Sequence, residues 1–401
     1  MSERDKDRMD FDSEELLLLT SIREVIKGRQ LDPVEHSLFF RKIDWQRLLD
    51  LAFENRVAAL LHYSLEKITL VPDKQKRILR GFYVETAQKN LRIKATLSRI
   101  LRSFKEEQID VILLKGVVLA YNVWPNPAIR QMHDIDLMVP KQDVVGADRA
   151  LRSMGFVTGS WDHSLEWYLE HFKDLPYYSL PDSDIFIELH HSWFQPHPFL
   201  KLDTEHFWGS SKRINFAGEP AGVFSPAHSL THLCMHVSCE HFLGDNMRSL
   251  IDISLLVRQD FGSLDWKQFL DIVIENGLER LAYFPLYLSR KYLNGEVDFE
   301  SLHLLEERLG LSPMQRGLIS KVGRDFLFKA DEKEFGSVGS QNRVLRRLAR
   351  EILWGRRSSI ITAAGCLLLP APQLTPLSFY GSVRKSALRI LSYMGKGLSR
   401  H

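Results

Sequence analysis

The sequence predicts an α+β protein in which a small mixed β-sheet core is flanked by N- and C-terminal helical regions. Residues 1–105 repeat apolar side chains at helical spacing and show no β-branched alternation. Residues 106–224 instead contain short buried runs and an alternating segment, which are typical of strands. Helical spacing returns over residues 225–340, and a basic tail with a short apolar segment follows over 341–401.

The N-terminal region predicts several helices. A first helix is expected to begin at a cap-like Ser13 and to end before Gly28. Apolar residues at helical spacing continue over 44–68. The mixed-charge segment 73–108 predicts one long helix.

The core segment predicts strands that alternate with helices. A buried apolar run predicts a first strand, and Asp134 begins a second one. Proline and glycine residues mark the ends of the intervening helices. The predicted elements are, in order, a strand over 109–116, a short helix over 117–124, a strand over 134–139, a helix over 140–155 and an alternating strand from 184 to 194.

Two acids stand one residue apart at the start of the second strand. Asp134 and Asp136 are expected to point to the same side, roughly 7 Å apart at Cα. Two such carboxylates repel each other unless a cation lies between them, and Mg²⁺ prefers oxygen ligands of this kind. Glu188, on the alternating strand, could complete a site of three carboxylates. We expect Asp136→Asn to leave the fold intact, with unchanged or slightly raised stability when Mg²⁺ is absent.

Four further residues are candidates for binding phosphate. Lys115 and Gly116 lie where the first strand passes into a helix, and such a junction offers backbone N–H groups to an anion. Arg130, four residues before Asp134, could hold a phosphate oxygen. His190 lies two residues after Glu188, so it is expected on the same face, where it could orient a carboxylate or contact a phosphate.

These segments together resemble a known family. "LLKG" at 113–116, "HDIDLMV" at 133–139 and "IELHHSW" at 187–193 are similar to the nucleotidyltransferase fold of the DNA polymerase β-like superfamily, in particular to its uncharacterised bacterial nucleotidyltransferases. The resemblance implies that Asp134, Asp136 and Glu188 are the metal ligands and that Lys115 and Gly116 lie at the nucleotide phosphates. The chain departs from the family in having Lys-Gly where Gly-Ser or Gly-Gly is usual, and Glu188 where many relatives have Asp.

The resemblance implies an enzyme that transfers nucleotides. Mg²⁺ or Mn²⁺ would be its cofactor and a nucleoside triphosphate such as ATP its substrate, with a small molecule, a glycan precursor or a protein as the acceptor and no nucleic-acid partner. The alternative is a non-catalytic nucleotide-sensing or scaffold protein of a polysaccharide or peptide-modification system. The intact set of three acids favours the enzyme.

A run of histidines follows the core. His228, His232 and His236 recur at four-residue spacing and would share one helix face. Three roles stay open for them, namely a structural role, the lining of the acceptor cleft and zinc binding. Trp193 is expected either to wall a base pocket or to lie in the core.

The chain's charge and cysteine content bear on its location. Residues 341–401 hold eleven Lys and Arg against one acid, Glu351, whereas the whole chain has a net charge of +2. This tail could be a solvated basic helix that packs on an acidic body, or it could contact a membrane surface peripherally. Three cysteines form no disulfide framework, the N-terminus lacks the apolar run of a signal peptide and no stretch is long enough to span a membrane, so we expect a cytoplasmic protein.

Overall fold

The computed structural model describes residues 11–32, 40, 43–159, 161–194, 204–240, 246–258 and 264–328. The described residues up to Leu311 belong to one compact unit, whereas 312–322 belong to a second unit. The basic tail and its apolar segment lie outside the described residues. No helix in the described ranges has both the length and the hydropathy needed to cross a membrane.

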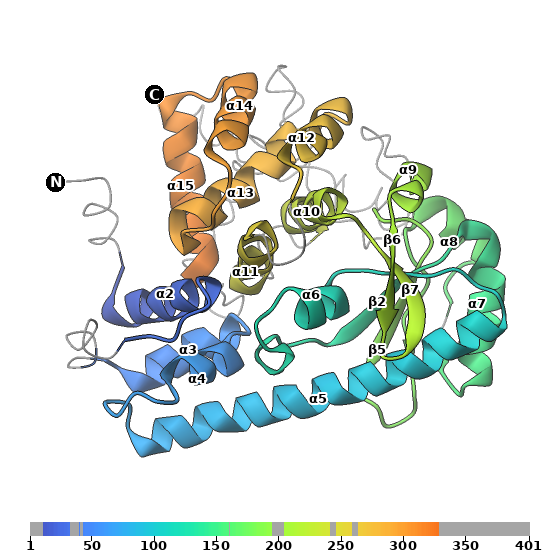
Figure 1. Ribbon diagram of the computed structural model, residues 1–401, viewed down its shortest axis with the longest axis horizontal. Coiled ribbons are helices and arrows are strands. Elements are labelled where there is room, and N and C mark those ends of the chain that lie inside the picture. The colour runs from blue at the N-terminus through green and yellow to red at the C-terminus, as the bar shows by residue number, and fades with distance from the viewer. Residues whose placement is uncertain are drawn as a thin grey trace, which may run out of the picture. The chain divides into compact units, whose positions relative to one another are not determined.

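Helices form the N-terminal part of the chain, as predicted. They are α2 (Ser13–Ile26), α3 (Trp45–Glu54), α4 (Ala58–Leu65) and α5 (Asp73–Glu106). The cap of α2 is Asp12 rather than Ser13, because Asp12 and Glu15 accept each other's backbone N–H in a capping box. The long helix predicted over 73–108 is a single 34-residue helix, α5, which runs along the sheet (Figure 1).

The predicted mixed sheet is confirmed, and its order in the described residues is β3-β4-β5-β2-β1-β7-β6. Parallel pairs join β2 to β5 and β1 to β7, and the remaining neighbours are antiparallel. The strands are β1 (Ile112–Leu113), β2 (Asp134–Met138), β3 (Val157–Thr158), β4 (Tyr178–Ser179), β5 (Phe186–His190), β6 (Lys212–Phe216) and β7 (Glu219–Val223).

The two faces of the central strands have different roles. Alternate side chains of β2 and β5 point to one face, and these residues are fully buried in a core that they share with apolar residues of α5 and α7 (Val144–Ser153). They are Ile135, Leu137, Ile187 and Leu189. The intervening residues, Asp134, Asp136, Glu188 and His190, therefore point to the other face.

Short elements connect the strands. The first predicted strand pairs over only two residues, and α6 (Gly116–Asn122) follows it as predicted. The remaining short elements are η2 (Pro127–Ile129), η3 (Lys141–Asp143), α8 (Leu165–His171) and α9 (Thr204–Gly209).

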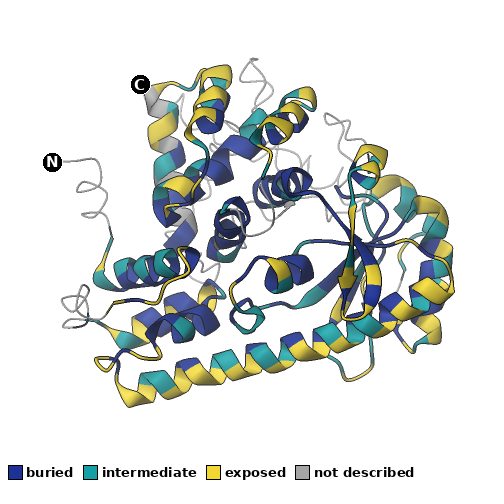
Figure 2. Cartoon of the chain, viewed as in Figure 1, coloured by how far each residue is buried: buried dark blue, intermediate teal, exposed yellow. Residues whose placement is uncertain are grey.

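The chain after the sheet is helical. Its elements are α10 (Pro226–Met235), the π-helical turn η4 (His236–Glu240), α11 (Asn246–Val257), α12 (Trp266–Glu275), α13 (Glu279–Leu293), α14 (Phe299–Leu309) and α15 (Pro313–Phe328). Helices α10 and α11 are buried along most of their length, as Figure 2 shows. Because α11 is enclosed, its polar residues must find partners inside the protein.

Candidate functional site

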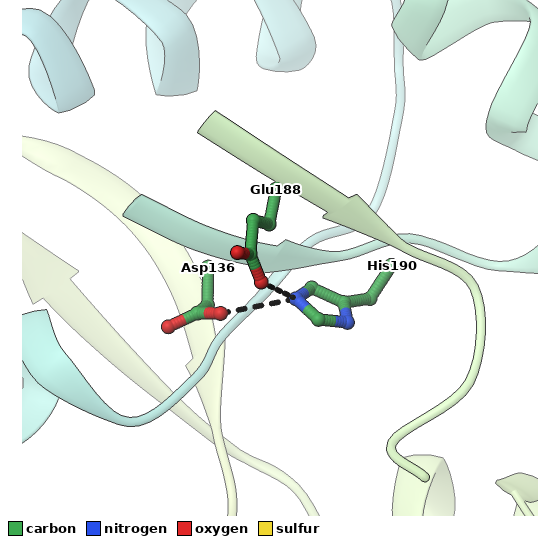
Figure 3. Close-up of side chains that lie close together, drawn as sticks. All are labelled: Asp136, Glu188 and His190. Atoms are coloured by element: carbon green, nitrogen blue, oxygen red, sulfur yellow. Dashed lines mark hydrogen bonds and ion pairs between the residues drawn. The ribbon is translucent and has the colours of Figure 1, made fainter. Parts of the chain in front are cut away.

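Asp136, Glu188 and His190 converge on one face of the sheet (Figure 3). Asp136 and Glu188 are paired residues of the parallel strands β2 and β5. The Nε2 atom of His190 lies 3.0 Å from Oδ1 of Asp136 and 3.4 Å from Oε2 of Glu188. One ligand atom from each residue lies within 4.8 Å of the others, and the described ranges hold no other such group of three acidic, His or Cys side chains.

Asp134 belongs to the same electrostatic cluster. It starts β2, two residues before Asp136, so its side chain leaves the strand on the same face. Burial and the negative charges of Asp136 and Glu188 raise the pKa of Asp134 to about 6. Ionisation of the Asp134 carboxyl in the folded protein therefore costs free energy, and a bound cation would offset this cost.

The pKa of Asp136 is shifted in the opposite direction to that of Asp134. Its side chain is only 5% exposed, and burial alone would raise its pKa. Lys115, whose Nζ lies 3.4 Å from Oδ1, and the hydrogen bond from His190 together hold the pKa of Asp136 well below its usual value. The ionised form of Asp136 is thus stabilised in the folded protein, and this pKa direction favours a loss of stability when its charge is removed, the opposite of what the sequence led us to expect.

His190 provides positive charge between the carboxylates. Burial alone would lower its pKa, but hydrogen bonds to Asp136 and Glu188 and the charge of Asp174 raise the pKa of His190 to about 9. Its second ring nitrogen, Nδ1, lies 3.7 Å from Oδ2 of Asp174. Asp174 precedes β4 and belongs to no motif, so its role is not evident from the sequence.

The carboxylates of this cluster suit a divalent cation. Three acids on one face supply the hard oxygen ligands that Mg²⁺ and Mn²⁺ prefer. The electrostatics support the fit, because burial and the negative charges of Asp136 and Glu188 raise the pKa of Asp134, and a bound cation would favour the ionised carboxylate. Lys115 and the protonated His190 neutralise part of this charge within the protein itself.

Lys115 has an unusual backbone conformation. Its φ of 43° and ψ of −112° lie in a region that side-chain-bearing residues rarely adopt. Gly116, which begins α6, is tightly enclosed, since a Cβ there would lie 3.2 Å from Nη1 of Arg130. Helix α6 has only seven residues, so the Lys115 side chain is the stronger candidate for binding phosphate.

Arg130 does not have the open position that a phosphate ligand requires. Only 4% of it is exposed, and its Nε and Nη2 atoms donate to the two carboxylate oxygens of Asp252 at 2.8 and 2.7 Å. The indole Nε1 of Trp124 also donates to Asp252, at 2.7 Å. The predicted phosphate contact is therefore replaced by a buried clamp between the segment before β2 and α11.

Arg248 was not identified from the sequence. It lies on α11, one turn before Asp252, and its Nη1 donates to the backbone oxygen of Gln131 at 2.9 Å. Its positive charge is close enough to Asp134 to lower the pKa of that acid. Helix α11 thus brings a cation as well as a carboxylate to the segment that leads into β2.

The histidine run packs chiefly against aromatic side chains. Nδ1 of His228 lies 2.7 Å from the hydroxyl of Ser225, and burial lowers the pKa of His228 to about 4. These contacts support a structural role for it. His232 meets Trp193 edge-on, and it lines a small hollow together with Lys115. Within the described ranges, His228, His232 and His236 belong to no group of three possible metal ligands.

Trp193 lies in the core and does not wall an open pocket. It is 1% exposed and stacks on Phe207, with the ring centroids 3.9 Å apart.

Comparison with known proteins identifies a matching family. The family model for an uncharacterised nucleotidyltransferase matches residues 41–294, which include every residue of the cluster. A comparison with curated proteins found no match. Among solved structures, the solution structure of the antibiotic-resistance factor ANT(2'')-Ia is similar at 11% identity, with a TM-score of 0.33. That similarity covers 46% of this chain and 91% of the other.

Proposed function

The chain belongs to the uncharacterised nucleotidyltransferase family and is therefore a nucleotidyl-transferring enzyme, and we propose that its reaction depends on a divalent cation held by Asp134, Asp136 and Glu188. A nucleoside monophosphate moves from a triphosphate to an acceptor hydroxyl, and pyrophosphate leaves. The observation that carries this proposal is the pairing of Asp136 with Glu188 on adjacent parallel strands, with Asp134 on the same face.

The three carboxylates are the proposed ligands of the cation. Their oxygens would hold Mg²⁺ or Mn²⁺ together with oxygens of the triphosphate. The bound cation would polarise the reacting phosphoryl group and stabilise the charge that develops during the displacement. Lys115, next to Asp136, would contribute a fixed positive charge to the phosphates.

His190 and Asp174 act as positioning residues. His190 donates from Nε2 to the facing carboxylates, and Asp174 lies beside the opposite ring nitrogen. This arrangement keeps Asp136 and Glu188 close together although both are negatively charged. The carboxylates are therefore arranged for a cation before it binds, which reduces the cost of organising the site.

The acceptor proposed is a small molecule, a glycan precursor or a protein. A screen with the four common nucleoside triphosphates, each labelled at the α-phosphate and supplied with Mg²⁺ or Mn²⁺, tests the reaction. We expect label to pass to a component of a cell extract with release of pyrophosphate. Binding of a triphosphate without any transfer would instead support the alternative of a nucleotide sensor or scaffold.

A further inference from the structure

We propose that Asp252, on α11, is a positioning residue for nucleotidyl transfer, and that it acts through Arg130 on the turn where α6 begins and on the strand that carries the acids. The inference rests on the proposed function and deepens it, because it makes the helical region after the sheet part of the triphosphate site. Breaking the clamp should therefore weaken the binding of a magnesium-bound polyphosphate, and not only the fold.

The clamp is made of buried side chains that meet in one geometry. Asp252 accepts from Nε and Nη2 of Arg130 at 2.8 and 2.7 Å, and from Nε1 of Trp124 at 2.7 Å. Because a guanidinium and a carboxylate pair edge to edge, these bonds fix the plane of the Arg130 guanidinium relative to α11. A buried ion pair adds little net stability over apolar residues of the same volume, so its geometry is the stronger reason for its presence.

The guanidinium of Arg130 lies against the start of α6. A Cβ on Gly116 would lie 3.2 Å from Nη1 of Arg130, so the two groups are almost in contact. The preceding residue, Lys115, places its Nζ 3.4 Å from Oδ1 of Asp136, and the backbone N–H of Leu114 donates to the backbone oxygen of Asp136 at 3.1 Å. The position of the guanidinium therefore bears on the turn that brings Lys115 to the acids.

Arg130 also fixes the entry to β2. Its backbone oxygen accepts from Nδ2 of Asn90, on α5, at 2.8 Å, while its side chain is bound to Asp252 on α11. Strand β2 begins four residues later, at Asp134. Two helices that are far apart in the sequence thus hold the segment from which the first of the acids is presented.

Loss of the Asp252 charge would change the position of Arg130. A buried guanidinium without its carboxylate has to find another partner or move towards water, because an unpaired buried charge is costly. Either movement takes the guanidinium away from Gly116 and loosens the entry to β2. Residues that support a binding group without touching the ligand commonly change affinity about ten- to a hundredfold when they are replaced.

Calorimetric titration with inorganic tripolyphosphate in Mg²⁺ buffer tests the inference, because it reports the dissociation constant separately from the fraction of competent protein. The variants are Asp252→Asn and the double variant Arg130→Met/Asp252→Asn, which leaves neither charge unpaired. Ser254→Ala is the matched control. Ser254 is also a buried polar residue of α11, but its hydroxyl lies 2.7 Å from that of Ser289, on α13, and not at the segment before β2.

We expect Asp252→Asn to bind tripolyphosphate about ten- to a hundredfold more weakly than the wild type. The double variant should regain part of the stability in urea unfolding but not the affinity, because Arg130 no longer supports the turn. A purely structural clamp would lower the fraction of competent protein and leave the dissociation constant unchanged. Ser254→Ala should bind as the wild type does, and should Asp252→Asn fail to fold, the double variant decides the matter.

Wild-type affinity in a folded Asp252→Asn variant, or in the double variant, would overturn the inference and leave the clamp with a structural role alone. An equal loss of affinity in Ser254→Ala would overturn it too, because any damage to α11 would then have the same effect. The proposed function would survive these results if label transfer is seen. Absence of tripolyphosphate binding in the wild type would contradict both the inference and the proposed function.

Discussion

Asp136 and Glu188 are paired across the parallel strands β2 and β5, and the imidazole of His190 contacts both carboxylates. Two negative charges are thereby held together by one positive charge. The electrostatic consequence differs among the acids, since the pKa of Asp136 is lowered whereas the pKa of Asp134 is raised. The acids of the cluster are therefore not interchangeable.

Asp134→Asn and Asp136→Asn should shift stability in opposite directions when no divalent cation is present. The folded protein binds a proton at Asp134 more tightly than the unfolded chain does, so the contribution of Asp134 is greatest at acid pH and is lost as pH rises through about 6. At pH 7.5, Asp134→Asn should raise the free energy of unfolding by about 1–3 kcal/mol. Asp136→Asn should lower it by roughly 3–5 kcal/mol, because Lys115 and His190 lose their buried partner.

Urea unfolding in EDTA measures both changes. Equal shifts in the two variants would contradict the assigned pKa directions.

His190 should make stability depend on alkaline pH. Its pKa is 6.5 in the unfolded reference and about 9 in the folded protein. A raised pKa contributes stability that is fully present below pH 6.5 and is lost as pH rises through 9. We expect the free energy of unfolding in EDTA to fall by roughly 2–3 kcal/mol over that range. The fall should be much smaller in His190→Gln, and an identical pH profile in that variant would show that other groups cause it.

Arg130 and Asp252 should behave as a coupled pair. Removing either partner leaves a buried charge, so Arg130→Met and Asp252→Asn should each lower the free energy of unfolding by about 3–5 kcal/mol. The double variant should be less destabilised than the sum of the single changes, because neither charge is then left alone. A double-mutant cycle by urea unfolding measures the coupling, and strictly additive losses would argue against the clamp.

The backbone conformation of Lys115 should lower stability, whereas its side chain should strengthen phosphate binding. Its positive φ costs roughly 1–3 kcal/mol for a residue with a side chain, whereas glycine adopts this region readily. Lys115→Gly should therefore be more stable than Lys115→Met, and both should bind Mg²⁺–tripolyphosphate about ten- to a hundredfold more weakly than the wild type. Calorimetry and thermal unfolding of the two variants separate the effects. Lys115→Met binding as well as the wild type would make the lysine structural.

Local sequence patterns predicted the fold well where short-range periodicity decides the structure. The phase of β2 places Asp134 and Asp136 on one face, and the alternation of β5 does the same for Glu188 and His190. The mixed-charge repeat over 73–108 also predicted α5 as one helix. The cap of α2 was misplaced by one residue, because Ser13 and Asp12 are both good cap residues and only the reciprocal bond with Glu15 distinguishes them.

Long-range partners could not be predicted in the same way. Arg130 meets a carboxylate 122 residues further along the chain, and nothing near either residue signals that contact. Arg248 likewise reaches Gln131 only because α11 packs beside the segment before β2. Lys115 pairs with Asp136 and has a positive φ, and no sequence motif indicates either feature.

The central claim, that the three acids form the metal site for nucleotidyl transfer, is tested most directly with Glu188→Gln. Glu188 has the same shape as glutamine and its side chain is 37% exposed, so the fold should tolerate the change. Pyrophosphate release is measured at saturating Mg²⁺ with the triphosphate identified by label transfer. We predict a rate roughly a hundred- to a thousandfold below that of the wild type, with unchanged thermal unfolding. A well-folded Glu188→Gln variant that releases pyrophosphate at the wild-type rate would contradict the account.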